Sequence, residues 1–386
     1  MYLDSPVTTA LRQISPYFDS GILDRDTCPV YMRKRALVCL QRILTQTPQN
    51  MQVRPISGPR VPEDPGAVLL YPFNAQSNMN AISFRQFHHV LTLHGESNKI
   101  ASFRPAARLY DYVCVAGPLA IDRYLDNGIF TSEDVDRGRL IQMGDSFVQR
   151  LGWLRPTAAD NQDGVLFYCP TWEGFGSQKA NYSSIVNGVG FEHVARLAKA
   201  KGIERIVVKP HPYLGMLRPW MWLHFLKGIR SLRHQGFHVR LALGDLQGLR
   251  SISLQLNLAR VQIHKEDDAN PLPVRLAVTD VSGMEAVLLI AGVPTLVVEV
   301  LRQPIPQRIA RIKQQKTLYK DGTALQVARA YLENATAIDR AHRAQLFSFH
   351  DPSLSRMINA KRMDWLTDYV HSDTFWNGAK PPERQY

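Results

Sequence analysis

The sequence predicts an α/β protein built of two doubly wound, Rossmann-like domains with a cleft between them. First, short apolar runs that end in turn or polar residues alternate with helical stretches, a pattern typical of parallel sheets covered by helices. Second, this pattern occurs twice, and a polar, turn-rich stretch at 154–164 separates the two blocks. Third, 386 residues are enough for two domains of ordinary size.

The first block follows a mixed region. Residues 1–65 are expected to form a helical or irregular segment, which ends in a Pro-rich link at 54–66. Strands are then predicted at 67–72, 90–93, 112–117 and 138–144, with a helix at 118–128. These elements define an N-terminal Rossmann-like domain over 66–155.

The second block is predicted to form a C-terminal Rossmann-like domain over 164–345. Its strands are expected at 164–170, 205–210, 239–245, 275–280 and 295–300, and its helices at 190–202, 223–236, 283–292 and 323–334. Residues 346–386 are expected to form a C-terminal helix and tail, with the helix following Ser353. Because ligands of open parallel sheets bind beyond the carboxyl ends of the strands, we expect the chemistry in the cleft.

The composition indicates a globular protein that attracts anions. There are 46 Lys and Arg against 34 Asp and Glu, a net charge of +12. This charge suits nucleic acid, anionic lipid or a phosphorylated substrate. No nucleic-acid-binding motif is present, so we expect no nucleic-acid partner. The basic segment 30–44 is either an ordinary packed helix with a solvated rim or a helix on an anionic membrane surface.

The sequence also points to a compartment. No apolar stretch is long enough to cross a membrane, and the first 20 residues lack the apolar core of a secretory signal. The four cysteines have no CxxC spacing, which argues against a zinc site or a disulfide scaffold and fits a reducing cytosol. We therefore expect a cytoplasmic protein, either free or peripheral at the inner face of the plasma membrane.

Two common nucleotide motifs are missing. No GxGxxG follows the first strand, so a nicotinamide or flavin site has no support, and no P-loop sequence occurs.

The most informative segment, 275–294, joins a strand to a helix. The predicted strand ends at Asp280, and Ser282 is placed to cap the next helix, with Glu285 at capping-box spacing. A helix N-terminus beyond a strand binds phosphate well, and Gly283 lets a ligand approach the backbone. The alternative is a plain capped helix.

Two histidines follow predicted strands. His211 lies between two prolines and two residues after Lys209, which suits phosphate contact or proton transfer. In the other block, His94 follows a strand, Gly95 opens the turn and Lys99 comes five positions later. For each histidine the alternative is a ring satisfied by nearby backbone.

Taken in order, these segments resemble the CDP-glycerol glycerophosphotransferase family, whose members build teichoic acids and related capsule polymers. The matching residues, spread over 68–360, are His94-Gly95 with Lys99, Pro170-Thr171-Trp172, Lys209-Pro210-His211-Pro212, Thr279-Asp280-Val281-Ser282, and Asp351 with Arg356. Two positions differ from the family pattern: Gly283 stands where a second serine is frequent, and 144–147 lacks the usual Pro and Arg.

The resemblance implies a GT-B architecture, an N-terminal acceptor domain, a C-terminal donor domain, and transfer of a polyol phosphate from a CDP-linked donor to a hydroxyl. It implies that His94 is the general base and that His211 binds or protonates the donor phosphates. The further donor-binding candidates are Lys209, Thr171, Asp280, Ser282, Gly283, Ser355 and Arg356, with Gly95 and Lys99 as additional site residues. No acidic metal cluster is apparent, so we expect neither a metal nor another cofactor.

The expected partners are a nucleotide-activated donor and a polymer or lipid-linked acceptor. Two other functions stay open at this point. One is a GT-B glycosyltransferase that uses a nucleotide-sugar donor for surface polysaccharide. The other is a non-catalytic relative that binds envelope precursors.

Overall fold

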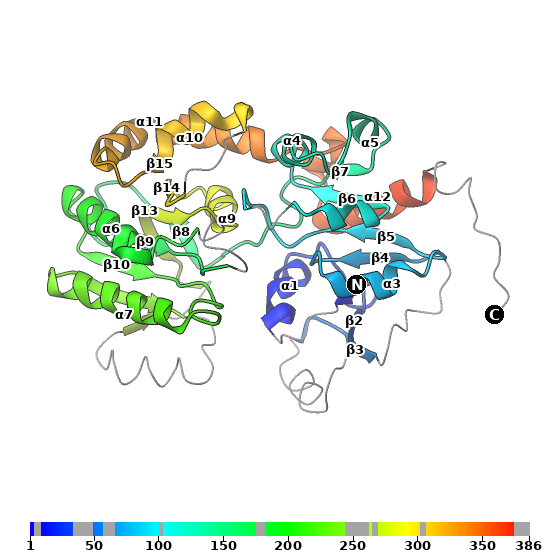
Figure 1. The fold of residues 1–386 in the computed structure, drawn as a ribbon, viewed down its shortest axis with the longest axis horizontal. Helices are drawn as coiled ribbons and strands as arrows, with labels where there is room; N and C mark the ends of the chain where they lie inside the picture. The colour runs from blue at the N-terminus through cyan, green and yellow to red at the C-terminus, as the bar shows by residue number, and fades with distance from the viewer. Residues whose placement is uncertain are drawn as a thin grey trace. The chain divides into compact units, whose positions relative to one another are not determined.

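The computed structural model describes residues 1–3, 9–33, 49–56, 66–99, 103–174, 182–243, 262–264, 269–301 and 306–373. The chain divides into two compact units. The N-terminal unit comprises Met1–Glu96, Ala101–Gln149 and Gln345–Tyr386. The C-terminal unit comprises Ser97–Ile100 and Arg150–Ala344. Each unit holds parallel sheet flanked by helices, so the predicted α/β class is confirmed (Figure 1).

The N-terminal unit contains a four-stranded parallel sheet in the order β4-β5-β6-β7. Its strands are β4 (Val68–Tyr71), β5 (His88–Leu91), β6 (Tyr112–Val115) and β7 (Leu140–Gln142). Its helices are η1 (Gln76–Asn78), α3 (Met79–Ile82), η3 (Pro105–Leu109), α4 (Pro118–Asp126) and α5 (Ser132–Asp136). All four residues of β6 are buried, as expected of a parallel strand covered on both faces.

The described part of 1–65 differs from the separate helical or irregular segment that the sequence predicts. It forms a second parallel sheet from β1 (Tyr2–Leu3), β2 (Val30–Arg33) and β3 (Val53–Ile56), together with α1 (Thr9–Asp19). The Tyr2 ring lies 5.7 Å from that of Tyr71 on β4, and Leu11 and Ile14 of α1 are buried in the core shared with β4 to β7. Of the basic segment 30–44, residues 30–33 form β2, and the rest lies outside the described residues.

The C-terminal stretch also belongs to the N-terminal unit. Ser348 donates its N–H to the carbonyl of Ala116 (2.9 Å) and accepts the Gly144 N–H on its own carbonyl (2.8 Å). After η7 (Pro352–Arg356), helix α12 (Asn359–Ser372) buries Leu366 and Val370 in the same core. The region that the sequence predicts as a C-terminal helix and tail is therefore integral to this unit.

Helix α12 also stabilises the segment where the family pattern is missing. The buried Arg362 guanidinium lies 3.2 Å from the Asp145 carboxylate and donates to the Leu354 carbonyl (2.9 Å). It also stacks 4.6 Å from the centroid of the Phe349 ring. An arginine from α12 thus holds the loop after β7 in place.

The C-terminal unit contains one parallel sheet in the order β12-β11-β10-β9-β13-β14-β15, with β8 paired to β13. Its strands are β8 (Leu154–Pro156), β9 (Val165–Cys169), β10 (Arg205–Val208), β11 (His238–Ala242), β12 (Gln262–His264), β13 (Leu272–Asp280), β14 (Thr295–Val298) and β15 (Thr317–Leu318). Its helices are η5 (Val186–Gly188), α6 (Val189–Ala200), α7 (Pro219–His234), α9 (Met284–Ile290), η6 (Gln307–Ile309), α10 (Ala310–Lys316) and α11 (Ala324–Leu346).

This strand order fixes where a ligand site can form. From β9 the sheet grows outward through β10 and β11 to β12, and β13 then lies on the other side of β9. The carboxyl ends of β9 and β13 are therefore a topological switch point, where open α/β sheets bind ligands. The strand β8 lies in the stretch 154–164 that the sequence predicts as a linker.

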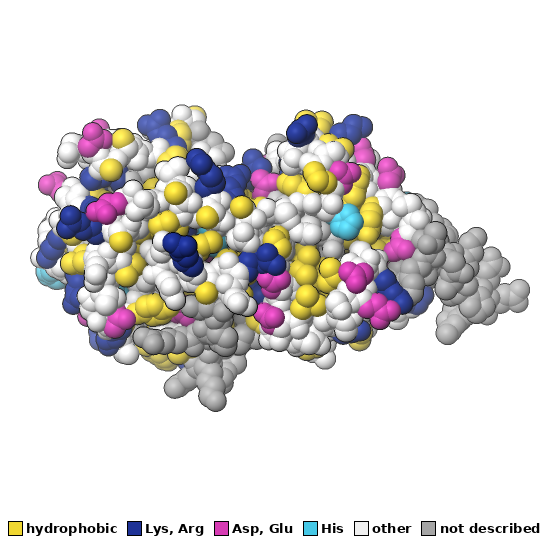
Figure 2. Space-filling view, turned by 90° about the horizontal axis from the view of Figure 1, so that it is seen from above, with side chains coloured by type: hydrophobic (Ala, Val, Ile, Leu, Met, Phe, Trp, Pro, Cys, Tyr) yellow, Lys and Arg dark blue, Asp and Glu magenta, His cyan; other side chains and the backbone are white. Residues whose placement is uncertain are grey.

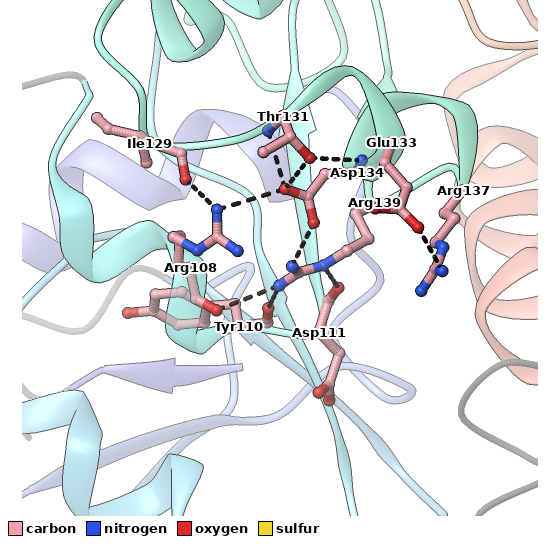
Figure 3. A network of polar contacts seen from close by, with 9 residues as sticks. All are labelled: Arg108, Tyr110, Asp111, Ile129, Thr131, Glu133, Asp134, Arg137 and Arg139. Carbon is pink, nitrogen blue, oxygen red and sulfur yellow. Dashed lines mark hydrogen bonds and ion pairs between the residues drawn. The ribbon is translucent and has the colours of Figure 1, made fainter.

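A polar network ties the amino ends of β6 and β7 in the N-terminal unit (Figure 3). Thr131 and Asp134 form a reciprocal capping box at α5, and Asp134 also accepts from Arg139 (2.8 Å), which in turn donates to the Tyr110 carbonyl (3.0 Å). Burial alone raises the pKa of the Asp134 carboxyl, but its bonds to Thr131 and Arg139 outweigh that effect and lower it. The network is a structural support at the sheet edge opposite the strands' carboxyl ends.

The change Asp134→Ala should lower the free energy of unfolding by about 2 kcal/mol, because it removes the cap and leaves Arg139 without its carboxylate. The neighbouring Glu133 makes an exposed pair with Arg137, so Glu133→Ala should cost only about 0.5 kcal/mol. Urea unfolding measures both values. Equal losses in the two variants would contradict a supporting role for the network.

Candidate functional site

The candidate site lies at the switch point of the C-terminal unit, around the fully buried carboxyl of Asp280. Its Oδ2 atom accepts the backbone N–H of Thr171 (2.7 Å) and of Ser184 (3.2 Å). The structure thus brings together Thr171 and Asp280, both predicted from the sequence, because they follow neighbouring strands. Having no exposed surface, the Asp280 side chain holds two loops in position and leaves ligand contact to the groups that it orients.

Lys99 joins this cluster from the segment that groups with the C-terminal unit. Its Nζ atom donates to the Thr171 hydroxyl (2.5 Å) and lies 5.9 Å from the Tyr182 ring centroid. Burial lowers the pKa of Lys99 to about 8, an effect that the Asp280 carboxylate opposes. Burial raises the pKa of Asp280 to about 6, against the hydrogen bonds from Ser184 and Thr171. The site therefore holds an ammonium and a carboxyl that both titrate close to neutral pH.

The helix after Asp280 departs from the predicted capping box. Ser282 Oγ does accept the Met284 N–H (3.3 Å) at the start of α9. Glu285, however, does not complete the box, because it is buried beside Lys313 (3.0 Å) and Lys316 (3.9 Å). Burial raises the pKa of Glu285, but the Lys313 charge and its neighbours lower it to about 2. Gly283 has an ordinary helical φ of −60°, so its backbone does not require glycine.

His211 is held in one orientation and one tautomer. Its Nδ1 atom accepts the N–H of Tyr213 (3.1 Å), and the Trp172 ring stacks on it at 5.6 Å and 18°. Because a backbone N–H only donates, Nδ1 carries the lone pair of the neutral ring, and the proton resides on Nε2. His211 therefore presents Nε2–H as a hydrogen-bond donor.

Lys209, two residues earlier, contacts a different group. Its ammonium lies 5.4 Å from the centroid of the Trp153 indole, which is a cation–π contact. Its predicted role as a phosphate ligand stays a prediction.

Glu173 is a site residue that the sequence analysis missed. Its buried carboxylate accepts three backbone N–H groups, from Gly215 (3.0 Å), Leu217 (3.1 Å) and Arg218 (2.9 Å). This carboxylate clamps the loop between His211 and α7 onto the strand end that carries Thr171. The only signal in the sequence is an acidic residue directly after Pro-Thr-Trp.

In the N-terminal unit, His94 lies on a sharply bent loop after β5. Its neighbours Leu93 (φ 59°) and Gly95 (φ 127°) both have positive φ, which is unusual for leucine and common at functional sites. The exposed His94 ring contacts Phe73 at 4.4 Å, and its Nδ1 lies 2.9 Å from the Pro72 carbonyl oxygen. Since a carbonyl only accepts, Nδ1 carries the proton and Nε2 carries the lone pair of the neutral ring.

The remaining candidates, Ser355 and Arg356, are exposed on η7 of the N-terminal unit. Ser355 Oγ donates to the Pro352 carbonyl (2.7 Å), and Asp351 caps η7 by accepting the Ser353 N–H (2.8 Å). A role of this segment near the nucleotide stays a prediction.

Among the described residues, no group of three or more His, Cys, Asp or Glu side chains is arranged to hold a metal ion. In the same part of the chain, every helix is too short or too polar to cross a membrane.

No model of a known protein family matches the chain, and no curated protein matches it in sequence. Among solved structures, a UDP-N-acetylglucosamine 2-epimerase aligns with 100% of this chain and 97% of its own, at 9% identity and a TM-score of 0.44. The E. coli heptosyltransferase WaaC with ADP aligns with 88% of this chain and 98% of its own, at 11% identity and a TM-score of 0.36. The E. coli ADP-heptose LPS heptosyltransferase II aligns with 88% and 97%, at 14% identity and a TM-score of 0.35. Likeness this distant shows neither an activity nor a ligand of this chain.

The change Glu173→Gln should lower the free energy of unfolding by about 2 kcal/mol, because an amide N–H₂ would then face backbone N–H donors. Glu192→Gln, at an exposed position of α6 in the same unit, should change it by less than about 0.5 kcal/mol. Denaturant unfolding measures both. A Glu173→Gln protein as stable as the control would show that the clamp is dispensable.

The raised pKa of Asp280 makes the free energy of unfolding depend on pH in a defined direction. In the unfolded chain this carboxyl titrates near its ordinary value of 3.8, and in the folded protein near about 6. Its contribution to stability is therefore full below pH 3.8 and is lost as the pH rises through 6. Asp280→Asn keeps an acceptor for Thr171 and cannot ionise. Its free energy of unfolding relative to the wild type should rise by about 1 kcal/mol from pH 5 to pH 7. A difference that stays flat over this range would show that the carboxyl is not held protonated.

Proposed function

We propose that this protein is a transferase that moves a polyol phosphate from a CDP-linked donor to an acceptor hydroxyl. The observation that carries the proposal is that His94 and His211, which both follow strands, are held as opposite tautomers. The neutral His94 ring has a lone pair on Nε2, as a general base needs, and the neutral His211 ring has a proton on Nε2, as a donor to a leaving phosphate needs.

The proposed reaction is a single displacement at phosphorus. His94 Nε2 takes the proton of the acceptor hydroxyl, and the oxygen attacks the phosphorus that bears the polyol. The bond from that phosphorus to the bridging oxygen breaks, and CMP leaves with the electron pair. His211 Nε2–H donates a hydrogen bond to the departing phosphate and stabilises its charge.

The switch point supplies the electrostatics of donor binding in this proposal. Lys99 and Thr171 present an ammonium and a hydroxyl at the strand ends, and the Asp280 carboxyl fixes the backbone of Thr171 by accepting its N–H. A fixed cation at this position favours a diphosphate over an uncharged ligand. The choice of cytidine and of a polyol rests on the family resemblance, whose matching residues include Thr171, His211 and Asp280.

The direct test offers the full-length protein a panel of CDP-glycerol, CDP-ribitol, a CMP-sugar and UDP-sugars. An oligomeric polyol-phosphate or lipid-linked acceptor is included, and the released nucleotide is identified. CMP should be released from a CDP-polyol, and His94→Ala and His211→Ala should each reduce turnover by about a hundredfold or more. His238→Ala, at the exposed amino end of β11 and therefore at the end of the sheet opposite the carboxyl ends of the strands, should leave turnover unchanged.

A finer pair of variants separates the two roles of His211. Gln places an amide N–H₂ near the position of Nε2, whereas Asn places an acceptor near Nδ1. If His211 acts by hydrogen bonding, His211→Gln should retain more activity than His211→Asn. Release of UDP from a UDP-sugar would replace the proposal with glycosyl transfer, and a failure to bind any of these nucleotides by calorimetry would favour a non-catalytic protein.

A further inference from the structure

Exposed apolar side chains gather at the start of α7 and in the loop before it. Met216 is 56% exposed, Leu217 48%, Trp220 42% and Leu223 56%. They are four of the ten large apolar residues that are exposed in the described part of the chain, and they fall within eight consecutive positions. Single exposed apolar residues are ordinary, but a contiguous group indicates a contact surface.

The helix has a distinct inner and outer face. The inner face of α7 packs beside α6 and β11 and buries Met221, Phe225 and Leu232. The outer face, defined by its exposed positions spaced three and four residues apart, consists of Trp220, Leu223, Lys227, Arg230 and His234. It is therefore apolar in its first two turns and basic in the turns that follow.

The charged side chains within this stretch of sequence have one sign. From Tyr213 to Leu243 the chain contains no Asp or Glu and five Lys or Arg residues. On the face of the molecule that Figure 2 shows, by contrast, basic side chains are scattered among acidic ones. The stretch that contains α7, unlike the face in Figure 2, carries basic residues without acidic ones.

The loop that presents the first two apolar residues is fixed in place. The Glu173 carboxylate accepts the N–H groups of Leu217 and Arg218, and Gly215 adopts a positive φ of 74°. The backbone of Met216 and Leu217 is therefore fixed before binding, which lowers the cost of ordering this loop.

We propose that the outer face of α7, with Met216 and Leu217, binds the surface of an anionic lipid bilayer. Trp220 and Leu223 would enter the headgroup region, where an indole is favoured, and Lys227 and Arg230 would face lipid phosphates. An apolar patch continued by two turns of cations matches a membrane surface, which offers both an apolar layer and a plane of negative charge. Binding of lipid by this surface does not depend on the proposed transferase reaction.

The test is cosedimentation of the full-length protein with vesicles of phosphatidylcholine alone or with about one third phosphatidylglycerol. We expect binding to the anionic vesicles that is at least about tenfold stronger than to the neutral ones and that weakens in high salt. The double variants Trp220→Ser with Leu223→Ser, and Lys227→Glu with Arg230→Glu, should each lose at least about tenfold in binding.

Matched controls lie on other helices of the same unit. Leu325→Ser removes an exposed apolar side chain from α11, and Lys199→Glu with Arg196→Glu reverses two exposed charges on α6. Both should bind anionic vesicles like the wild type, and circular dichroism should show all variants folded. Equal binding by every variant, or no binding by the wild type, would overturn the proposal. A concentration-dependent dimer that Trp220→Ser with Leu223→Ser abolishes, without vesicle binding, would instead identify a second copy of the chain as the occupant.

Discussion

The buried carboxyl of Asp280 is the interaction on which the rest of the C-terminal site depends. It terminates the longest strand of the sheet and accepts backbone N–H groups from the loop after β9 and from Ser184. A charged group in this position is costly to bury, and the ammonium of Lys99 and the two N–H donors offset part of that cost. The hydrogen bond from the Thr171 N–H also fixes the position of Thr171 beyond the strand ends. The Asp280 carboxyl therefore determines both the position of the Thr171 hydroxyl and the charge beside it.

The strand-end histidines show how backbone groups can decide the chemistry of a side chain. A carbonyl oxygen next to His94 and an amide N–H next to His211 select opposite tautomers of the same ring. Each selecting group comes from a residue in a local turn or neighbouring strand end, Pro72 in one case and Tyr213 in the other. Identical residue types can therefore be prepared for opposite tasks without any difference in their own chemistry.

The order of the larger elements could be predicted because each apolar run is long enough to be recognised. The strands near 112–115 and 165–169 are buried along their whole length and read as continuous apolar sequence. By contrast, β1 has two residues, which carry no periodicity, so the first sheet went unpredicted. Ion pairs between residues far apart in the sequence cannot be predicted from it either. The spacing of Ser282 and Glu285 fits a capping box, but in the structure the Glu285 carboxylate pairs with Lys313.

The residues of the site likewise fall into those that the sequence predicts and those that only the structure reveals. The sequence predicts Thr171 and Asp280 separately as candidates, and the strand order that makes β9 and β13 neighbours brings them together. Ser184 donates its backbone N–H to Asp280, and Glu173 accepts three further backbone N–H groups. Because every residue except proline has a backbone N–H, the residue type does not reveal such donors. Sequence reasoning therefore finds the side chains of a site more readily than the framework that aims them.

The discontinuous make-up of the N-terminal unit bears on how the protein can be divided. Its core takes α12 from the far end of the chain, and a fragment that stops at Gln149 would leave bare the apolar surface that Leu366 and Val370 cover. The C-terminal unit is nearly continuous, yet a fragment starting at Arg150 would lack Lys99 and leave the Thr171 hydroxyl without its donor. Each unit is assembled from segments that are interrupted in the sequence by the other unit, so neither can be excised as a single stretch with its parts complete.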